Sequence, residues 1–262
     1  MSLYKEVAGD GPALVLIHAG ICDSRMWDPQ WATFPRDHRT IRYDLRGFGR
    51  SPLTPGPFAH ARDLAALLDG LGVERAALVA ASYGGQVALE LAVARPDLVG
   101  LLVLAGASLP GHDWSAAVRD FFAEEEAALE RGDLDAAVEA NLRTWVDGSG
   151  RAPGTVDPAV REAVGQMQRR AFELQLHFAE NDEEEDLVPD WPDRIGKLQV
   201  PALMLVSDHD QPDIHTIAAR LARELPQART ATISGAAHLP SMERPAAFDE
   251  LVLAFLAEHQ RR

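Results

Sequence analysis

Short runs of apolar residues recur along the chain, and turn-forming residues bound each of them. The clearest runs are Ala13–His18, Thr40–Tyr43, Ala76–Ala81, Leu101–Leu104, Pro201–Val206 and Thr230–Ile233. Continuous apolar runs of this length are typical of strands buried on both faces of a mainly parallel sheet. Segments with helical periodicity, Phe58–Leu71 and Gln86–Ala94, lie between them. This alternation predicts a doubly wound α/β sheet with helices on both faces.

The strand pattern is absent between about Leu109 and Gly196. Helical patterns replace it and cover Trp114–Arg131, Leu134–Asp147 and a segment that runs from Asp157 towards Ala179. Asp133 and Asp157 are expected to cap two of these helices. A helical block between two strand-bearing segments predicts a cap inserted over the sheet. We therefore expect a core domain of residues 1–108 and 197–262 and a helical cap (lid) over residues 109–196.

Composition and charge narrow the class of protein. The 262 residues carry a formal net charge of −15, which disfavours binding to nucleic acid or to an anionic membrane surface. The single cysteine, Cys22, excludes an intrachain disulfide and any multi-cysteine metal site, and is expected to be a small buried residue. No apolar run approaches the ~20 residues of a membrane span. These features predict a cytoplasmic globular protein, and they leave its oligomeric state open.

One apolar run ends in a serine between very small residues, in the segment AALVAASYGGQ over residues 76–86. A serine on a tight turn from strand to helix is held in a strained conformation that exposes its hydroxyl. That turn closes only when the residues two positions before and after are small, as Ala80 and Gly84 are here. The N–H groups at the start of the helix could stabilise an oxyanion. Ser82 is thus a candidate nucleophile; a glycine-rich turn with an incidental serine is the alternative.

This pattern resembles the nucleophile elbow of the α/β-hydrolase family, with Ala80 where the family usually has glycine. The resemblance extends over nearly the whole chain. Residues 16–20, LIHAG, resemble the family's His-Gly loop, and residues 44–51 are similar to its Asp-X-Arg-Gly-X-Gly-X-Ser loop. The resemblance implies an oxyanion hole formed by the N–H groups of Gly20 and Tyr83. It also implies a mostly parallel eight-stranded sheet, with the cap inserted after the sixth strand.

A nucleophilic serine needs a base, because an isolated hydroxyl is hardly ionised at neutral pH. Residues 234–245, SGAAHLPSMERP, resemble the family's Gly-X-Gly-His loop with its downstream Glu-X-Pro, with Ala237 in place of the second glycine. The resemblance implies that His238 is the base, although a loop histidine taken alone is more often a surface residue. The strand at residues 201–206 leads to Asp208 and Asp210, and the family spacing selects Asp210 as the acid.

A metal site is the rival interpretation of the segment after this strand. Carboxylate and imidazole groups are common metal ligands, but their spacing here fits none of the compact metal motifs. The candidate ligands are Asp208, His209, Asp210, Asp213 and His215.

The resemblance implies a Ser-His-Asp hydrolase that works through an acyl-enzyme and needs no cofactor. Ser82 excludes the dehalogenases and epoxide hydrolases of the family, which use Asp at that position. Residues 23–30, DSRMWDPQ, are similar to esterases and enol-lactonases, which favours a small carboxylic ester or lactone as substrate. A carbon–carbon bond hydrolase, a perhydrolase and a ligand receptor with a vestigial triad are the alternatives.

Two further sets of residues carry weaker expectations. The acidic run over residues 182–186 is expected to be solvated surface without chemistry. Aromatic and imidazole side chains of the helical block could line a substrate pocket or belong to its core. They are Trp114, Trp145, Phe172, His177 and Trp191.

Overall fold

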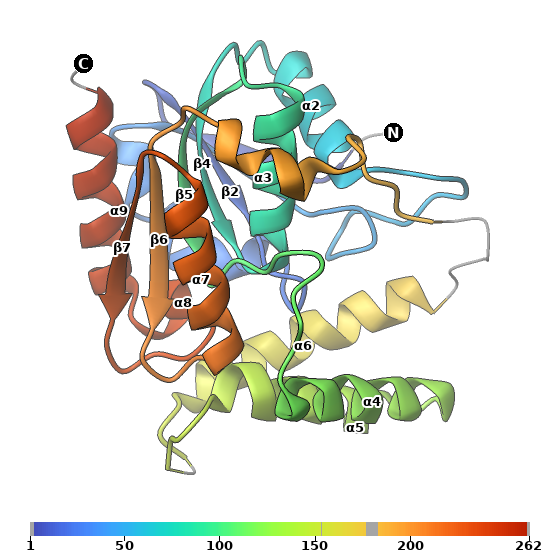
Figure 1. Ribbon diagram of the computed structural model, residues 1–262. Helices are drawn as coiled ribbons and strands as arrows, with labels where there is room; N and C mark the ends of the chain where they lie inside the picture. The colour runs from blue at the N-terminus through green and yellow to red at the C-terminus, as the bar shows by residue number, and fades with distance from the viewer. Residues whose placement is uncertain (1–2, 153, 177–182, 261–262) are drawn as a thin grey trace.

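The protein is built around one twisted sheet, seen in a computed structural model that describes residues 3–152, 154–176 and 183–260 (Figure 1). The strands follow the order β1-β3-β2-β4-β5-β6-β7, and every neighbouring pair is parallel except β1 and β3. The mostly parallel sheet is as expected. The strands are β1 (Lys5–Ala8), β2 (Ala13–Ile17), β3 (Arg39–Tyr43), β4 (Ala76–Ala81), β5 (Val99–Ala105), β6 (Ala202–Ser207) and β7 (Ala228–Ile233).

The expected number of eight strands is wrong, because the described residues form a seven-stranded sheet. The helical block accordingly follows the fifth strand and not the sixth. The apolar runs account for six strands, and β1 at the sheet edge is the seventh. Its side chains alternate between exposed and half-buried, so this strand has no continuous apolar run. The eighth strand had been implied by the family resemblance alone.

Helices cover both faces of the sheet because each central strand is apolar on both sides. On β2, Val15 and Ile17 pack in one core cluster, while Leu14 and Leu16 pack in the other. The first cluster includes side chains of α2 (His60–Gly70), α3 (Tyr83–Ala94) and α7 (Pro212–Glu224). The second includes side chains of the C-terminal helix α9 (Pro245–Gln260). Short helical segments complete the chain: η1 (Ser24–Trp27), α1 (Asp28–Trp31), η2 (Phe34–Arg36) and α8 (Pro240–Glu243).

Helices α4 (Ala116–Glu130), α5 (Leu134–Asn141) and α6 (Pro158–Gln175) lie between β5 and β6 in the chain. Figure 1 shows them together at the end of the sheet to which the strand arrows point. The expected caps are present: Asp133 accepts a hydrogen bond from the N–H of Ala136, and Asp157 accepts one from that of Ala159. The division into core and cap domains remains a prediction.

Two other segments complete this region of the chain. Helix α5 continues into a π-helical segment, η3 (Leu142–Asp147), and η4 (Trp191–Lys197) packs against α3. Within the described part of the chain, no helix combines the length and the apolar character needed to cross a membrane.

His60 at the start of α2 is expected to make folding sensitive to acid. The ring is 3% exposed, its Nδ1 has no hydrogen-bond partner among the described residues, and burial lowers its pKa to about 3. Below its ordinary pKa the unfolded chain binds a proton that the folded protein does not. Stability is therefore lost as the pH falls from about 6.5 towards 3.

The measurement is urea unfolding at pH 7 and pH 5, with His60→Asn as the comparison. The wild type should lose about 2 kcal/mol more of its free energy of unfolding than the variant over this interval. Equal losses in the two proteins would contradict the assignment of this acid sensitivity to His60.

Candidate active site

Ser82 occupies a strained turn between β4 and α3. Its backbone has φ 51° and ψ −118°, a region that residues with a side chain rarely adopt. Hydrogen bonds on both sides hold the turn: the Ser82 N–H donates to the carbonyl of Ala105, and the Ser82 carbonyl accepts from the N–H of Gly85. The sequence predicted this turn, and Ser82 lines a cavity of the protein.

Small residues permit the turn, as expected. A Cβ added at Gly84 would lie 2.5 Å from the carbonyl oxygen of His18. One added at Gly106, whose φ is +56°, would lie 3.1 Å from Nδ1 of His238. Gly106 was not singled out from the sequence. Its role is visible only once β5 is placed beside the His238 loop.

The structure brings His238 and Asp210 together from loops that follow β7 and β6. Nδ1 of His238 lies 3.0 and 2.9 Å from the two carboxylate oxygens of Asp210, and both side chains are buried. Asp210 also accepts a hydrogen bond from the N–H of Gln211, which fixes the carboxylate. His238 lines the same cavity as Ser82. The three residues chosen from the sequence therefore lie near the carboxyl ends of β4, β6 and β7, with Asp210 in contact with His238 and His238 in the same cavity as Ser82.

The rival metal ligands point to separate partners. Asp208 accepts a hydrogen bond from the N–H of Gly235, and Asp213 accepts one from the N–H of Ser115. His209 contacts the carbonyl of Ser149 through Nδ1. Over the described ranges, no group of three or more His, Cys, Asp and Glu side chains has the arrangement of a metal site. This geometry favours Asp210 as a partner of His238 over a role as a metal ligand.

Gly20 and Tyr83, the expected oxyanion donors, lie side by side. A Cβ at Gly20 would be 3.3 Å from that of Tyr83, and Tyr83 is the first residue of α3. A helix leaves the N–H groups of its first turn without intrahelical acceptors. The positions of both residues are therefore compatible with the predicted oxyanion hole.

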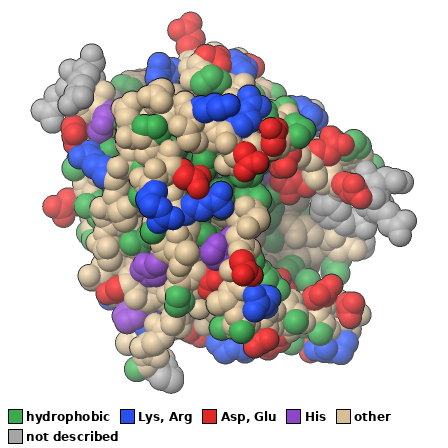
Figure 2. Space-filling model, in the orientation of Figure 1, with side chains coloured by type: hydrophobic (Ala, Val, Ile, Leu, Met, Phe, Trp, Pro, Cys, Tyr) green, Lys and Arg blue, Asp and Glu red, His purple; other side chains and the backbone are tan. Residues whose placement is uncertain are grey.

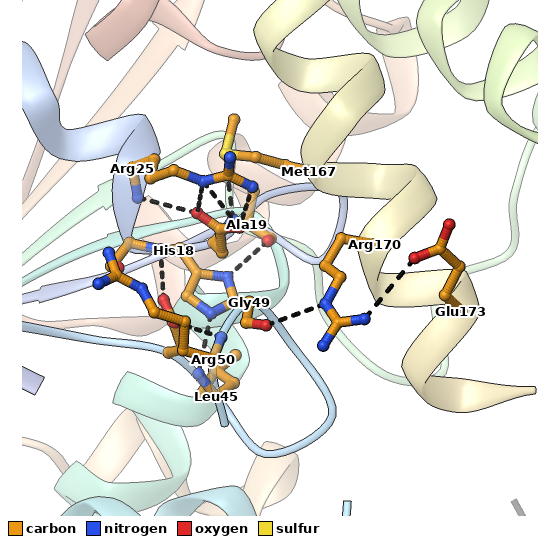
Figure 3. Close-up of polar contacts among 12 residues, drawn as sticks. His18, Ala19, Arg25, Leu45, Gly49, Arg50, Met167, Arg170 and Glu173 are labelled. Atoms are coloured by element: carbon orange, nitrogen blue, oxygen red, sulfur yellow. Dashed lines mark hydrogen bonds and ion pairs between the residues drawn. The ribbon is translucent and has the colours of Figure 1, made fainter. Parts of the chain in front are cut away.

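The loop that carries Gly20 is fixed by His18 (Figure 3). The ring is fully buried, and its Nε2 accepts a hydrogen bond from the N–H of Leu45, while Nδ1 donates to the carbonyl of Ala19. This pattern corresponds to a neutral imidazole with its proton on Nδ1. Burial lowers the pKa of His18, which favours the same form.

Helix α6 contacts the loops of the sheet beside this histidine (Figure 3). The thioether of Met167 accepts a hydrogen bond from the N–H of Asp23, and the guanidinium of Arg170 donates to the carbonyl of Gly49. Arg25 forms an ion pair with Asp23 at 2.7 Å. These contacts join α6, which lines the cavity, to the loop after Gly20 and to the loop of residues 44–51. Cys22 in that loop is buried, as expected, and burial raises the pKa of its thiol.

The cavity beside Ser82 has a volume of about 460 Å³. Of the aromatic candidates, Trp114, Trp145 and Phe172 line it, whereas Trp191 is buried in the core behind α3. His177 lies outside the described residues. The acidic run is exposed at residues 183–186, as expected, although Glu184 accepts a hydrogen bond from the hydroxyl of Tyr83.

Several polar residues of the cavity were missed in the sequence. Glu125, Asn141 and Gln168 lie on α4, α5 and α6, and each lines the cavity. Their helices have an ordinary amphipathic pattern, in which a polar residue facing a cavity cannot be told from one facing water. Only the packing of the three helices reveals them.

The π-helical segment η3 supports the His238 loop from the cavity side. The carbonyl of Trp145 accepts a hydrogen bond from the N–H of His238, and the two rings lie 4.7 Å apart. The carbonyl of Thr144 accepts one from the side chain of Gln211, next to Asp210. Local π-helical geometry is frequent at functional sites, and here it presents two carbonyls to the candidate base and acid loops.

A buried ion pair closes the other side of the His238 loop. Arg151 and Glu243 are 2.6 Å apart, with side chains 7% and 4% exposed. Glu243 also accepts a hydrogen bond from the N–H of Ala237, and Arg151 donates to the carbonyl of Gly235. The Glu of the downstream Glu-X-Pro pattern therefore holds the backbone on the amino side of His238.

Replacing Glu243 by alanine should lower the free energy of unfolding by about 3–5 kcal/mol, because it leaves the Arg151 guanidinium buried without its carboxylate. Urea unfolding measures this loss. Glu124→Ala serves as the matched control, since its ion pair with Arg143 is half exposed and should contribute less than about 1 kcal/mol. Equal losses in the two variants would contradict a structural role for the buried pair.

The chain is similar in sequence to proteins named as hydrolases. The chain is 28% identical to a protein of Azorhizobium caulinodans named "Putative carbamate hydrolase RutD", over 98% of this chain and 95% of that one. It is 27% identical to the 2-hydroxy-6-oxononadienedioate/2-hydroxy-6-oxononatrienedioate hydrolase of Burkholderia vietnamiensis, over 97% and 90%.

A solved structure of a thermophilic esterase from Thermogutta terrifontis, with malate bound, superposes with a TM-score of 0.79. It is 28% identical and covers 98% of this chain and 94% of its own. The model of the alpha/beta hydrolase fold family matches residues 12–245, and the chain therefore belongs to this family.

Proposed function

We propose that the protein is a serine hydrolase that cleaves a small carboxylic ester or lactone through an acyl-enzyme intermediate. One observation carries the proposal. The strained Ser82 shares a cavity with His238, and Nδ1 of His238 is hydrogen-bonded to the buried Asp210. A serine, an imidazole and a carboxylate in this relation form the constellation that activates a hydroxyl for attack on a carbonyl.

In the proposed reaction, Oγ of Ser82 attacks the substrate carbonyl while Nε2 of His238 takes the hydroxyl proton. Asp210 holds the imidazole with Nδ1 protonated and stabilises the imidazolium that forms. The tetrahedral intermediate expels the alkoxide, which receives the proton from His238. Water then attacks the acyl-enzyme with His238 again as base, releasing the carboxylic acid and restoring Ser82.

The N–H groups of Gly20 and Tyr83 are proposed to bind the oxyanion of both tetrahedral intermediates. Each such donor typically contributes about 3 kcal/mol to the stabilisation of the transition state. The neutral His18 keeps the Gly20 loop in place, and the start of α3 adds the favourable end of the helix dipole. No step of this mechanism needs a metal or an organic cofactor.

The cavity supports a substrate of modest size. Its volume of about 460 Å³ and its aromatic wall suit a substrate with a small acyl or alkoxy group. The names of two relatives, an esterase and a carbamate hydrolase, both denote a carbonyl bonded to a heteroatom leaving group. This shared chemistry supports an ester or lactone.

A carbon–carbon bond hydrolase is the second candidate, because one relative carries such a name. That name describes a substrate with two carboxylates, which would need basic partners. Among the described residues that line the cavity, none is Lys or Arg. The site therefore supports ester or lactone cleavage better.

Hydrolysis of p-nitrophenyl esters of increasing acyl length, together with five- and six-membered lactones, tests the proposal. We expect turnover with an optimum at short chains, set by the volume of the cavity. Equal inactivity of the wild type and Ser82→Ala towards all these compounds, with no phosphonate adduct, would contradict it. Covalent labelling of Ser82 without turnover would instead indicate a ligand receptor on the same fold.

A further inference from the structure

The cavity beside Ser82 carries charge of one sign only. Glu125 is the sole acidic residue among its described lining residues, and none of them is Lys or Arg. Figure 2 shows acidic and basic side chains side by side on the outer surface. On α4 and α5, Glu124 forms an ion pair with Arg143, and Asp135 forms one with Arg169. Glu125 differs from the adjacent Glu124 in that it lines the cavity, where none of the described lining residues is basic.

Glu125 is held in place by a neutral donor. Nδ2 of the buried Asn141 donates to Oε1 of Glu125 at 2.5 Å and also to the carbonyl of Ala137 at 3.0 Å. Burial raises the pKa of the Glu125 carboxyl, which means that the charged form lacks full compensation within the protein. A cation in the cavity would supply that compensation.

Gln168 provides a second, independent observation. Its side chain is 4% exposed and lines the cavity, and its Oε1 has no hydrogen-bond partner among the described residues. Buried amide oxygens are almost always paired, so an unpaired one beside a cavity points to a donor group supplied by a ligand.

Aromatic rings complete this part of the wall. Trp114 and Phe122 meet edge to face with centroids 5.7 Å apart, and Phe121 meets Trp145 in the same way at 5.6 Å. All four residues line the cavity. Aromatic faces attract cations, and a carboxylate among such rings is a recurrent arrangement for binding an ammonium group.

We propose that the substrate of this site carries a protonated or quaternary amine, which Glu125, Gln168 and the aromatic wall bind while Ser82 attacks the carbonyl. The proposal rests on the hydrolytic function proposed above and specifies its substrate class. Glu125 and Gln168 are specificity-determining residues in it and take no part in the chemical steps.

Pairs of substrates that differ only in charge test the proposal. In the first pair, acetylthiocholine carries an ammonium in its leaving group, and 3,3-dimethylbutyl thioacetate is its neutral counterpart. In the second pair, the p-nitrophenyl ester of 4-(trimethylammonio)butyrate carries the ammonium in its acyl group, and the p-nitrophenyl ester of 5,5-dimethylhexanoate is its neutral counterpart. We expect kcat/KM to be at least about tenfold higher for the cation in one of the two pairs.

The Glu125→Gln variant should reduce that ratio to about twofold, since it removes the charge and keeps the shape. Glu124→Gln, one residue away on the exposed side of α4, should leave the ratio unchanged. A third pair, 2-(dimethylamino)ethyl thioacetate and 3-methylbutyl thioacetate, adds one N–H donor. Gln168→Leu should lower its ratio more than that of the quaternary pair.

Equal measurable rates within both quaternary pairs in the wild type, or a preference for the cation that survives in Glu125→Gln, would overturn the proposal. Calorimetric binding of the same compounds to Ser82→Ala separates it from the proposed function. Cation-selective binding that depends on Glu125, without any hydrolysis by the wild type, would contradict the hydrolytic function alone. Hydrolysis without cation selectivity would contradict this inference alone.

Discussion

Replacing Ser82 by alanine is expected to lower kcat for ester hydrolysis by about 10⁴–10⁶-fold, because it removes the atom that attacks the carbonyl. The rate that remains would come from the oxyanion donors and from binding. The turn itself should persist, since its hydrogen bonds involve only the backbone of residue 82. Steady-state kinetics at saturating p-nitrophenyl acetate measure the loss in kcat, and urea unfolding shows whether the variant is folded.

Ser108 provides the matched control for this variant. It lines the same cavity, where its hydroxyl accepts a hydrogen bond from the side chain of Gln86 at 2.6 Å. The Ser108→Ala variant should keep most of the activity, because its hydroxyl has no role in the proposed steps. A large loss in Ser108→Ala with activity retained in Ser82→Ala would contradict the assignment and indicate Ser108 as the nucleophile.

The second large effect is expected for Asp210→Asn, which should lower kcat by about 10⁴-fold. An amide in place of the carboxylate can donate to Nδ1 of His238 and so favours the tautomer in which Nε2 carries the proton. His238 then cannot take the proton of Ser82, although the two side chains keep their positions. The activity profile against pH and the kcat of the variant test this directly.

Asp208→Asn separates the two acidic residues of this loop. Asp208 accepts a hydrogen bond from the N–H of Gly235, and an asparagine oxygen can accept the same bond. We expect kcat close to that of the wild type. Equal losses in the two variants would mean that the loop as a whole, and not the carboxylate of Asp210, supports the reaction.

The strands were predictable because a parallel sheet covered on both faces demands continuous apolar runs. All six runs fall within or overlap described strands. The edge strand β1 was not predicted, because Lys5 and Glu6 belong to a half-exposed pairing with β3 and form no apolar run. The helix expected at residues 134–147 ends as a π-helix, a change of hydrogen-bond register that the periodicity of apolar residues does not encode.

For the candidate site, the local pattern indicated Ser82, while the family resemblance implied His238 and its spacing selected Asp210 over Asp208. These residues sit on loops whose sequence patterns are tied to a backbone shape, such as the strained turn at Ser82. The wall of the cavity was not predictable in the same way. Glu125 and Gln168 reach it from separate helices, so their roles depend on how α4 and α6 pack and not on any local pattern.

The most direct test of the central claim is mass spectrometry of the protein after reaction with a p-nitrophenyl phosphonate. The account predicts one adduct per chain, found on the peptide that contains Ser82, absent from Ser82→Ala and strongly slowed in Asp210→Asn. An adduct on Ser108 or on another residue, or equal labelling of the wild type and Ser82→Ala, would contradict the assignment of Ser82 as the nucleophile.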